Sequence, residues 1–273
     1  MPGGVRARAE ARPAKQPARE GGPVRYRARV EYDGTDFSGF QKQPRRRTVQ
    51  SELESALARL SAGGRVDVEG AGRTDAGVHA RAQLIAFSYA GRLDAGELHR
   101  SLLALLPADI GIGPLRRVAA DYRPRYAVRW REYRYAIWNG PRSPLRERYA
   151  LGVDEPLDVA TMAAAGRHFV GRHDFSAFGG ADRQPVRTVR QVSVSRRGRV
   201  ITVRVIGDAF LRQMVRRMVA ALVRVGRGRA SATDVAAALG SPGRPAFDGD
   251  AAPAHGLCLW QVTEGRQTSG KIR

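Results

Sequence analysis

Gly72-Arg73-Thr74-Asp75-Ala76-Gly77-Val78-His79 is the stretch from which the fold and chemistry of this chain can be inferred. It places one carboxylate, Asp75, two positions after Arg73 and between two glycines. Residues two apart on an extended backbone point to the same side, and a nearby guanidinium favours the ionised carboxylate that a nucleophile needs. The three glycines at 70, 72 and 77 predict tight turns and room for a planar ligand. Residues 65–69 alternate polar and apolar, which predicts a half-buried strand leading into the motif.

In an arbitrary sequence, an Arg-x-Asp pair in a glycine-rich turn is more often structural than catalytic. Seven further segments change that weighting: Glu31-Tyr32-Asp33-Gly34, Phe37-Ser38-Gly39-Phe40-Gln41, Thr48-Val49-Gln50-Ser51-Glu52-Leu53-Glu54, Tyr133-Arg134-Tyr135, His173-Asp174-Phe175-Ser176-Ala177-Phe178, Phe210-Leu211-Arg212-Gln213-Met214-Val215-Arg216 and Ala252-Pro253-Ala254-His255-Gly256-Leu257. In this order and at these spacings, the segments and the octapeptide resemble the tRNA pseudouridine synthase A family. The resemblance runs from about Tyr26 to Val262.

The resemblance implies an isomerase that converts uridine to pseudouridine in the anticodon stem-loop of tRNA, at positions 38, 39 and 40. It implies Asp75 as a nucleophile that forms a transient covalent adduct with the nucleotide, at either the base or the sugar, without a metal or an organic cofactor. The target base has to leave its stack first, at a cost of roughly a few kcal/mol. A homodimer whose clefts hold tRNA is also implied.

Two further site residues follow from the same resemblance. Tyr133 is expected to stack on the target base, and Arg216 to enter the active site beside Asp75; with Arg73 these complete the candidate site. Strand alternation puts Tyr133 and Tyr135 on one face, and strand aromatics are often core. Tyr135 is therefore interpreted as packing.

The chain departs from the family pattern at two places. The stretch before Tyr133 reads Tyr122-Arg123-Pro124-Arg125-Tyr126-Ala127, in which only Arg125 matches, and the contacts of its neighbours stay open. Arg217 stands where the family usually has Asn, and no role is assigned to it.

Composition favours a polyanionic partner. The 273 residues carry a formal charge of +21, and only Lys15, Lys42 and Lys271 among the 47 basic residues are not arginine. Arginine forks suit phosphates and stack on bases, so nucleic acid ranks ahead of a membrane surface. The single cysteine, Cys258, excludes an intrachain disulfide framework. Without a long apolar run or a secretory signal, a cytoplasmic location is expected.

Periodicity predicts two similar β-α-β-β-α-β halves, which places the chain in the α+β class. The resemblance implies that their sheets join side by side around a basic active-site cleft. We expect a disordered basic arm at 1–23, an N-terminal half at 24–125 that carries Asp75, a C-terminal half at 126–264 and a flexible tail at 265–273. Predicted strands lie near 24–32, 65–69, 82–88, 115–120, 133–138, 187–195, 200–206 and 257–263, and predicted helices near 48–62, 94–106, 158–169, 208–225 and 231–239.

The sequence is less consistent with three other kinds of function. His79, His173 and Asp174 could suggest a metal, but the chain has five histidines and no spaced ligand set, so no metal is expected. No phosphate-binding glycine motif indicates a nucleotide cofactor. A non-catalytic, basic RNA-binding or ribosome-associated factor would explain the charge, but it would not explain the octapeptide around Asp75.

Overall fold

The structure is a computed structural model that describes residues 22–61, 64–179, 182–241, 247 and 250–265. The strands are β1 (Val24–Tyr32), β2 (Val68–Gly70), β3 (His79–Tyr89), β4 (Ile110–Ile112), β5 (Arg116–Arg117), β6 (Val128–Asn139), β7 (Leu151–Val153), β8 (Gly171–Asp174), β9 (Val186–Arg197), β10 (Val200–Gly207) and β11 (Leu257–Glu264). The helices are α1 (Val49–Leu60), α2 (Ala95–Leu105), α3 (Pro124–Ala127), α4 (Pro144–Glu147), α5 (Val159–Arg167), α6 (Met214–Gly226) and α7 (Ala232–Leu239), with short 3₁₀ turns η1 (Ser176–Phe178) and η3 (Ala254–Gly256).

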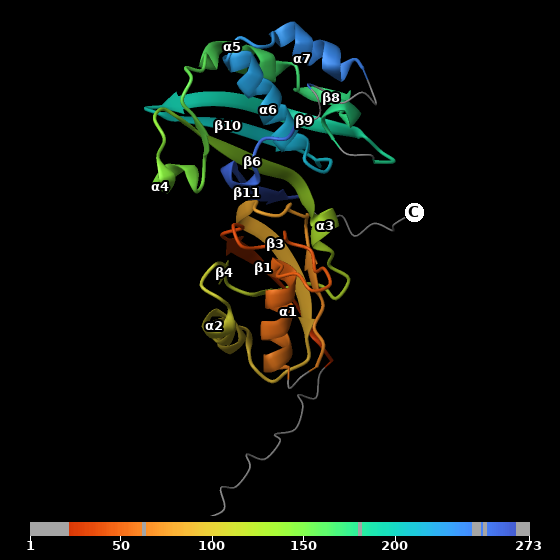
Figure 1. Ribbon diagram of the computed structural model, residues 1–273. Helices are drawn as coiled ribbons and strands as arrows, with labels where there is room; N and C mark the ends of the chain where they lie inside the picture. The colour runs from red at the N-terminus through yellow and green to blue at the C-terminus, as the bar shows by residue number, and fades with distance from the viewer. Residues whose placement is uncertain (1–21, 62–63, 180–181, 242–246, 248–249, 266–273) are drawn as a thin grey trace, which may run out of the picture.

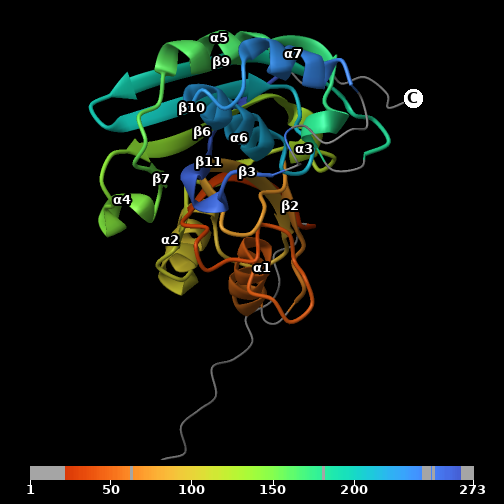
Figure 2. The same cartoon turned by 45° about the horizontal axis from the view of Figure 1, so that its top comes forward.

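All of these strands belong to one sheet with the main order β4-β1-β3-β11-β6-β10-β9-β8. The last strand, β11, lies between the two halves: Leu259 pairs in parallel with Ala80 of β3 and antiparallel with Tyr133 of β6. Figure 2 shows β3, β11 and β6 meeting between the two groups of helices. The expected α+β fold, with two halves whose sheets join side by side, is confirmed.

The helices follow from local sequence signals. Thr48 caps α1, its side chain accepting from Ser51 N, and an N-cap of this kind is worth about 1 kcal/mol. A capping box of Asp94 with Glu97 opens α2, and Ser231 caps α7. In Figure 1, α5, α6 and α7 gather on the strands of the C-terminal half, while α1 and α2 lie beside those of the N-terminal half.

The predicted start of the long helix was wrong. A helix over 208–225 was expected because Phe210 continues the apolar period of the residues after it, whereas α6 begins at Met214. Gln213 adopts a left-handed conformation with φ of 61°, so the helix cannot extend backwards through it. The residues before Gln213 instead connect β10 to α6 and bring Phe210 edge-on against Tyr133.

Strand boundaries were less predictable than the helices. The strand expected at 65–69 is confined to β2, and the one expected near 115–120 is reduced to the two residues of β5. A short strand at Ile110–Ile112 was not foreseen. The two-residue loop Gly198-Arg199 joins β9 to β10, and Gly198 has φ of 58°. Most of the arm at 1–23 and of the tail at 265–273 lies outside the described residues.

No helix in the described part of the chain is both long enough and apolar enough to cross a membrane.

The loop after β1 packs so closely on the octapeptide that two glycines are required. A Cβ on Gly34 would lie 2.1 Å from Val78 O, and one on Gly39 would lie 2.7 Å from Thr74 O. Gly39 also has φ of 94°, which disfavours any L side chain.

We expect Gly34→Ala to lower the free energy of unfolding by more than about 1 kcal/mol, because the backbone carrying Asp75 has to move. Urea denaturation measures this. Gly111→Ala is the matched control, since no atom lies within 4 Å of its Cβ position. Equal stability of the two variants would contradict the tight packing of this loop.

Candidate active site

The octapeptide connects β2 to β3 and is held by the backbone of the loop after β1. Phe40 N donates to Thr74 O at 3.2 Å, and Gly77 N donates to Phe37 O at 3.2 Å. Backbone hydrogen bonds on both sides of Asp75 therefore fix the position of its Cα.

The three predicted glycines differ in what they contribute. Gly77 has φ of 75°, as expected for a tight turn. A Cβ on Gly70 would meet the Phe40 ring at 2.4 Å, so the space there is taken by the protein itself and not left for a planar ligand. A Cβ on Gly72 would make only an ordinary contact, 3.7 Å from Arg131 Nε.

Thr74 separates the two charged residues of the motif. Its side chain is buried, and its hydroxyl lies 2.8 Å from the Tyr32 hydroxyl. Arg73 is exposed, and the Asp75 side chain is 31% exposed. Within the described residues, however, Arg73 forms no ion pair with Asp75.

The arginine that reaches Asp75 is Arg216, from the N-terminal part of α6. Its NH1 lies 3.5 Å from Asp75 Oδ2, and its side chain is only 15% exposed. Arg216 Nε donates to Ala252 O at 2.6 Å, and Ala252 N donates to Arg216 O at 3.1 Å. Arg216 is thus held on both its side chain and its backbone, and it joins the two halves at the candidate site.

Tyr133 is packed, and it is near enough to the same carboxylate for the charge of Asp75 to affect its pKa. Its ring meets Phe210 edge-on at 5.3 Å and is 8% exposed. Burial raises the pKa of Tyr133 to about 12, with the nearby charge of Asp75 adding to the rise and that of Arg131 opposing it. The hydroxyl is therefore protonated at neutral pH and can donate a hydrogen bond.

Arg131 is a residue of this site that the sequence analysis missed. Its NH2 donates to Ala71 O at 2.8 Å, and its NH1 donates to Asp208 O, at the end of β10. Burial lowers the pKa of this guanidinium, which is a sign of substantial desolvation. Arg131 therefore fastens the entry of the motif loop to the C-terminal half. The sequence signal for Arg131 is its position two residues before Tyr133, which places both side chains on the same face of the strand.

Two residues fix the segment that Arg216 contacts. Tyr135 is fully buried and donates its hydroxyl to Pro253 O at 2.8 Å, so its interpretation as packing agrees with the structure. Gly34 N donates to His79 Nδ1 at 2.9 Å, Asp33 Oδ1 lies 3.1 Å from the same nitrogen, and His79 Nε2 lies 3.1 Å from His255 O. Desolvation lowers the pKa of His79, and the nearby charge of Asp33 opposes this shift.

The other metal candidate has a similar backbone partner. His173 Nε2 lies 3.0 Å from Val170 O. Among the residues that the structure describes, no three His, Cys, Asp or Glu side chains gather as a metal site would require.

The departures from the family pattern have structural partners. Tyr122 is buried and donates its hydroxyl to Glu264 Oε2 at 3.1 Å. Arg125, which matches the pattern, is exposed, and its carbonyl oxygen lies 3.5 Å from Arg131 NH2. Arg217 NH1 donates to Gly179 O at 2.6 Å, which ties α6 to the end of η1. None of these contacts reaches Asp75.

Tyr133 allows packing to be separated from a role at the site. We expect Tyr133→Ala to lower the free energy of unfolding by roughly 3 kcal/mol, because a packed ring is lost, and to lose turnover even where the variant is still folded. Thermal melting without RNA, followed by an assay well below the melting temperature, measures both effects. Tyr133→Phe keeps the ring and serves as the control. Full turnover by folded Tyr133→Ala would show that Tyr133 contributes only to packing.

Comparison with known proteins assigns the chain to a family. A family model described as tRNA pseudouridine synthase matches residues 28–127 and 165–263. Proteins named tRNA pseudouridine synthase A are similar over most of their length. The one from Pelobacter propionicus is 43% identical over 238 residues, covering 86% of this chain and 97% of that protein. The one from Solidesulfovibrio magneticus is 45% identical over 253 residues, covering 89% and 92%.

Similarity to solved structures is much weaker. A chain of the archaeal box H/ACA Nop10–Cbf5 complex aligns with a TM-score of 0.32 and 13% identity, covering 72% of this chain and 44% of that chain. This likeness is too distant to support an argument. The sequence comparisons are sufficient: the chain belongs to the tRNA pseudouridine synthase A family.

Proposed function

We propose that this protein isomerises uridine to pseudouridine in tRNA, with Asp75 as the nucleophile. The relatives named tRNA pseudouridine synthase A share more than 40% of their residues with this chain over nearly their whole length. The observation that carries the assignment of Asp75 is its contact with Arg216, at 3.5 Å from the opposite half of the fold.

The reaction needs little beyond a positioned carboxylate. The N1–C1′ bond of uridine breaks, the uracil turns, and a C5–C1′ bond forms, while C5 loses a proton and N1 gains one. No net oxidation or reduction occurs. Asp75 forms a transient bond to the nucleotide and is released when the new carbon–carbon bond is complete.

The proposed roles of the other site residues follow from their positions. Arg216 favours the ionised form of the Asp75 carboxylate and orients it toward the nucleotide. The hydrogen bond from Arg216 Nε to Ala252 O keeps the guanidinium in place. Tyr133 offers a ring and a protonated hydroxyl beside the carboxylate. Arg73, which is exposed next to Asp75, contacts the RNA.

We also propose the anticodon stem-loop as the target, at positions 38, 39 and 40, and a homodimer as the active form, both carried over from the family resemblance. The charge of +21 supports a large RNA substrate. Mapping of pseudouridine in a tRNA treated with the protein identifies the positions, and sedimentation equilibrium identifies the oligomeric state.

Asp75→Asn is the direct test of the nucleophile. The near-isosteric amide keeps the shape but cannot form the adduct, so we expect a folded protein that binds unmodified tRNA and makes no pseudouridine. A pseudouridine-specific assay on a tRNA transcript measures the product. Turnover by folded Asp75→Asn would remove Asp75 from the mechanism, and absence of product with the unaltered protein would favour a non-catalytic RNA-binding factor.

Two arginines of the site should behave differently. Arg216→Gln releases the Asp75 carboxylate, and misplacement of a catalytic group by about 1 Å can cost roughly 100-fold, so we expect kcat to fall by about that factor. Arg73→Gln should mainly raise the KM for tRNA, because Arg73 makes no contact with Asp75. Steady-state kinetics measure kcat and the KM for tRNA of each variant. The reverse pattern would assign Arg73, and not Arg216, to the carboxylate.

A further inference from the structure

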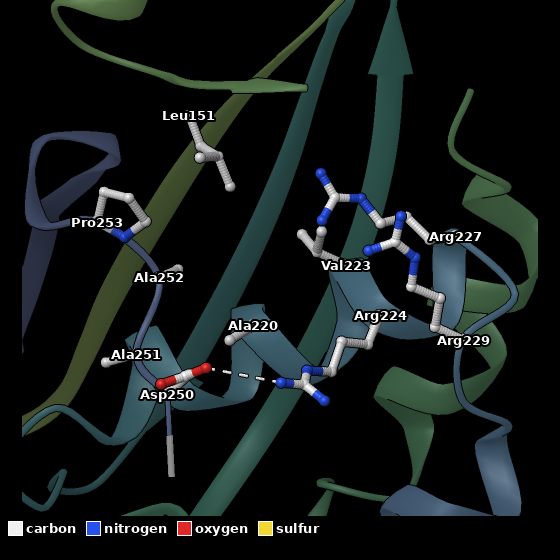
Figure 3. Close-up of a pocket in the computed structure, with 10 residues that line it drawn as sticks. All are labelled: Leu151, Ala220, Val223, Arg224, Arg227, Arg229, Asp250, Ala251, Ala252 and Pro253. Carbon is white, nitrogen blue, oxygen red and sulfur yellow. Dashed lines mark ion pairs between the residues drawn. The ribbon is translucent and has the colours of Figure 1, made fainter. Parts of the chain in front are cut away.

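A groove runs beside α6, next to the candidate active site but separate from it. Its volume is about 470 Å³, and one wall is formed by Arg224, Arg227 and Arg229. The segment of Asp250, Ala252 and Pro253 forms the other wall. Figure 3 shows the arginines and the Asp250 segment on opposite sides of this space.

The groove and the candidate site share one residue. Ala252 lines the groove, and its carbonyl oxygen accepts the hydrogen bond from Arg216 Nε. Along α6, residues four apart lie on one face, so Arg216, Ala220 and Arg224 form a row. Arg224 is eight residues beyond Arg216, a distance of about 12 Å along the helix. The groove therefore continues from the site along one helix face.

Charge is the main chemical feature of the groove. Arg224 NH2 lies 3.6 Å from Asp250 Oδ2, and the Asp250 side chain is 76% exposed. Arg227 Nε and Arg229 NH2 lie 2.8 and 2.7 Å from the two carboxylate oxygens of Glu155, which is 45% exposed. Both carboxylates are solvated, and the contact of Arg224 with Asp250 is long for a hydrogen bond. An anion of the right shape can replace Asp250 at little cost.

We propose that this groove holds phosphodiester groups of the tRNA backbone close to the nucleotide that Asp75 attacks. The inference rests on the proposed function and adds a binding site for the tRNA strand that flanks the target nucleotide. Arginine forks match phosphate oxygens in charge and geometry. No aromatic ring lines the described part of the groove, so it offers no platform for a base or a free nucleoside. The groove therefore binds the backbone without reading the sequence.

Substitution of Asp250 is expected to change the KM for tRNA in a direction that loss of stability would not produce. In the RNA-free protein its carboxylate is one counter-charge of Arg224, and it competes with an incoming phosphate. Asp250→Asn removes this negative charge from the wall of the groove without removing an arginine. We expect a lower KM for tRNA from Asp250→Asn and a higher KM from Arg224→Gln and Arg229→Gln.

Kinetics on an unmodified tRNA transcript at several salt concentrations test the groove. Each arginine variant should raise KM by about three- to tenfold, keep kcat, and reduce the slope of log KM against log salt by roughly 0.7–1. Arg100→Gln removes the same charge from the exposed side of α2 and is the control. Ethylation interference then shows whether Arg224→Gln loses contact with particular phosphates.

The outcomes separate this inference from the proposed function. Opposite shifts of KM in Asp250→Asn and Arg224→Gln, with kcat kept and Arg100→Gln unchanged, support the groove. Unchanged KM and salt slope in both arginine variants would overturn it, even though the protein still makes pseudouridine. A shift of the same size in Arg100→Gln would also overturn it, because total charge and not the groove would then explain the effect. Failure of the unaltered protein to make pseudouridine would instead count against the proposed function.

Discussion

The insertion of β11 between β3 and β6 is the constraint on which the rest of this molecule depends. Leu259 pairs with Ala80 of β3 on one side and with Tyr133 of β6 on the other. Only β11 therefore separates β3 from β6, although these two strands are about fifty residues apart in sequence. Asp75 lies just before β3, and Tyr133 lies on β6. The backbone hydrogen bonds of a single strand thereby set the distance across which the candidate site is assembled.

Arginines complete this assembly from the side of the C-terminal half. Arg131 binds the carbonyl oxygens of Ala71 and Asp208, and Arg216 binds Ala252 O beside its contact with Asp75. Removing a guanidinium from water is costly unless its donors find partners. Carbonyl oxygens from several segments supply those partners without neutralising the charge. The site can therefore keep positive charges close to the Asp75 carboxylate, where an RNA backbone would need them.

Local sequence signals were sufficient where a structural element depends on its own residues. The capping residues Thr48, Asp94 and Ser231 begin helices as predicted, because an N-cap acts within one turn. The start of α6 was predicted wrongly because the period of its apolar residues continues into Phe210, which packs against Tyr133 in the neighbouring strand. Competition between a helical face and a tertiary contact is not visible in a window of local sequence.

By itself, the sequence determined the family, the α+β class and the identity of Asp75 and Arg216 as site candidates, because motifs and periodicity are carried by residues in order along the chain. Only the tertiary structure decided which charge faces Asp75. Arg73, two residues away, is exposed and makes no ion pair with it, whereas Arg216, far away in sequence, lies 3.5 Å from it. The burial of Thr74 against Tyr32 sets the orientation of the motif loop, and the packing of α6 brings Arg216 to it. Both depend on contacts between distant segments, which spacing along the chain does not encode.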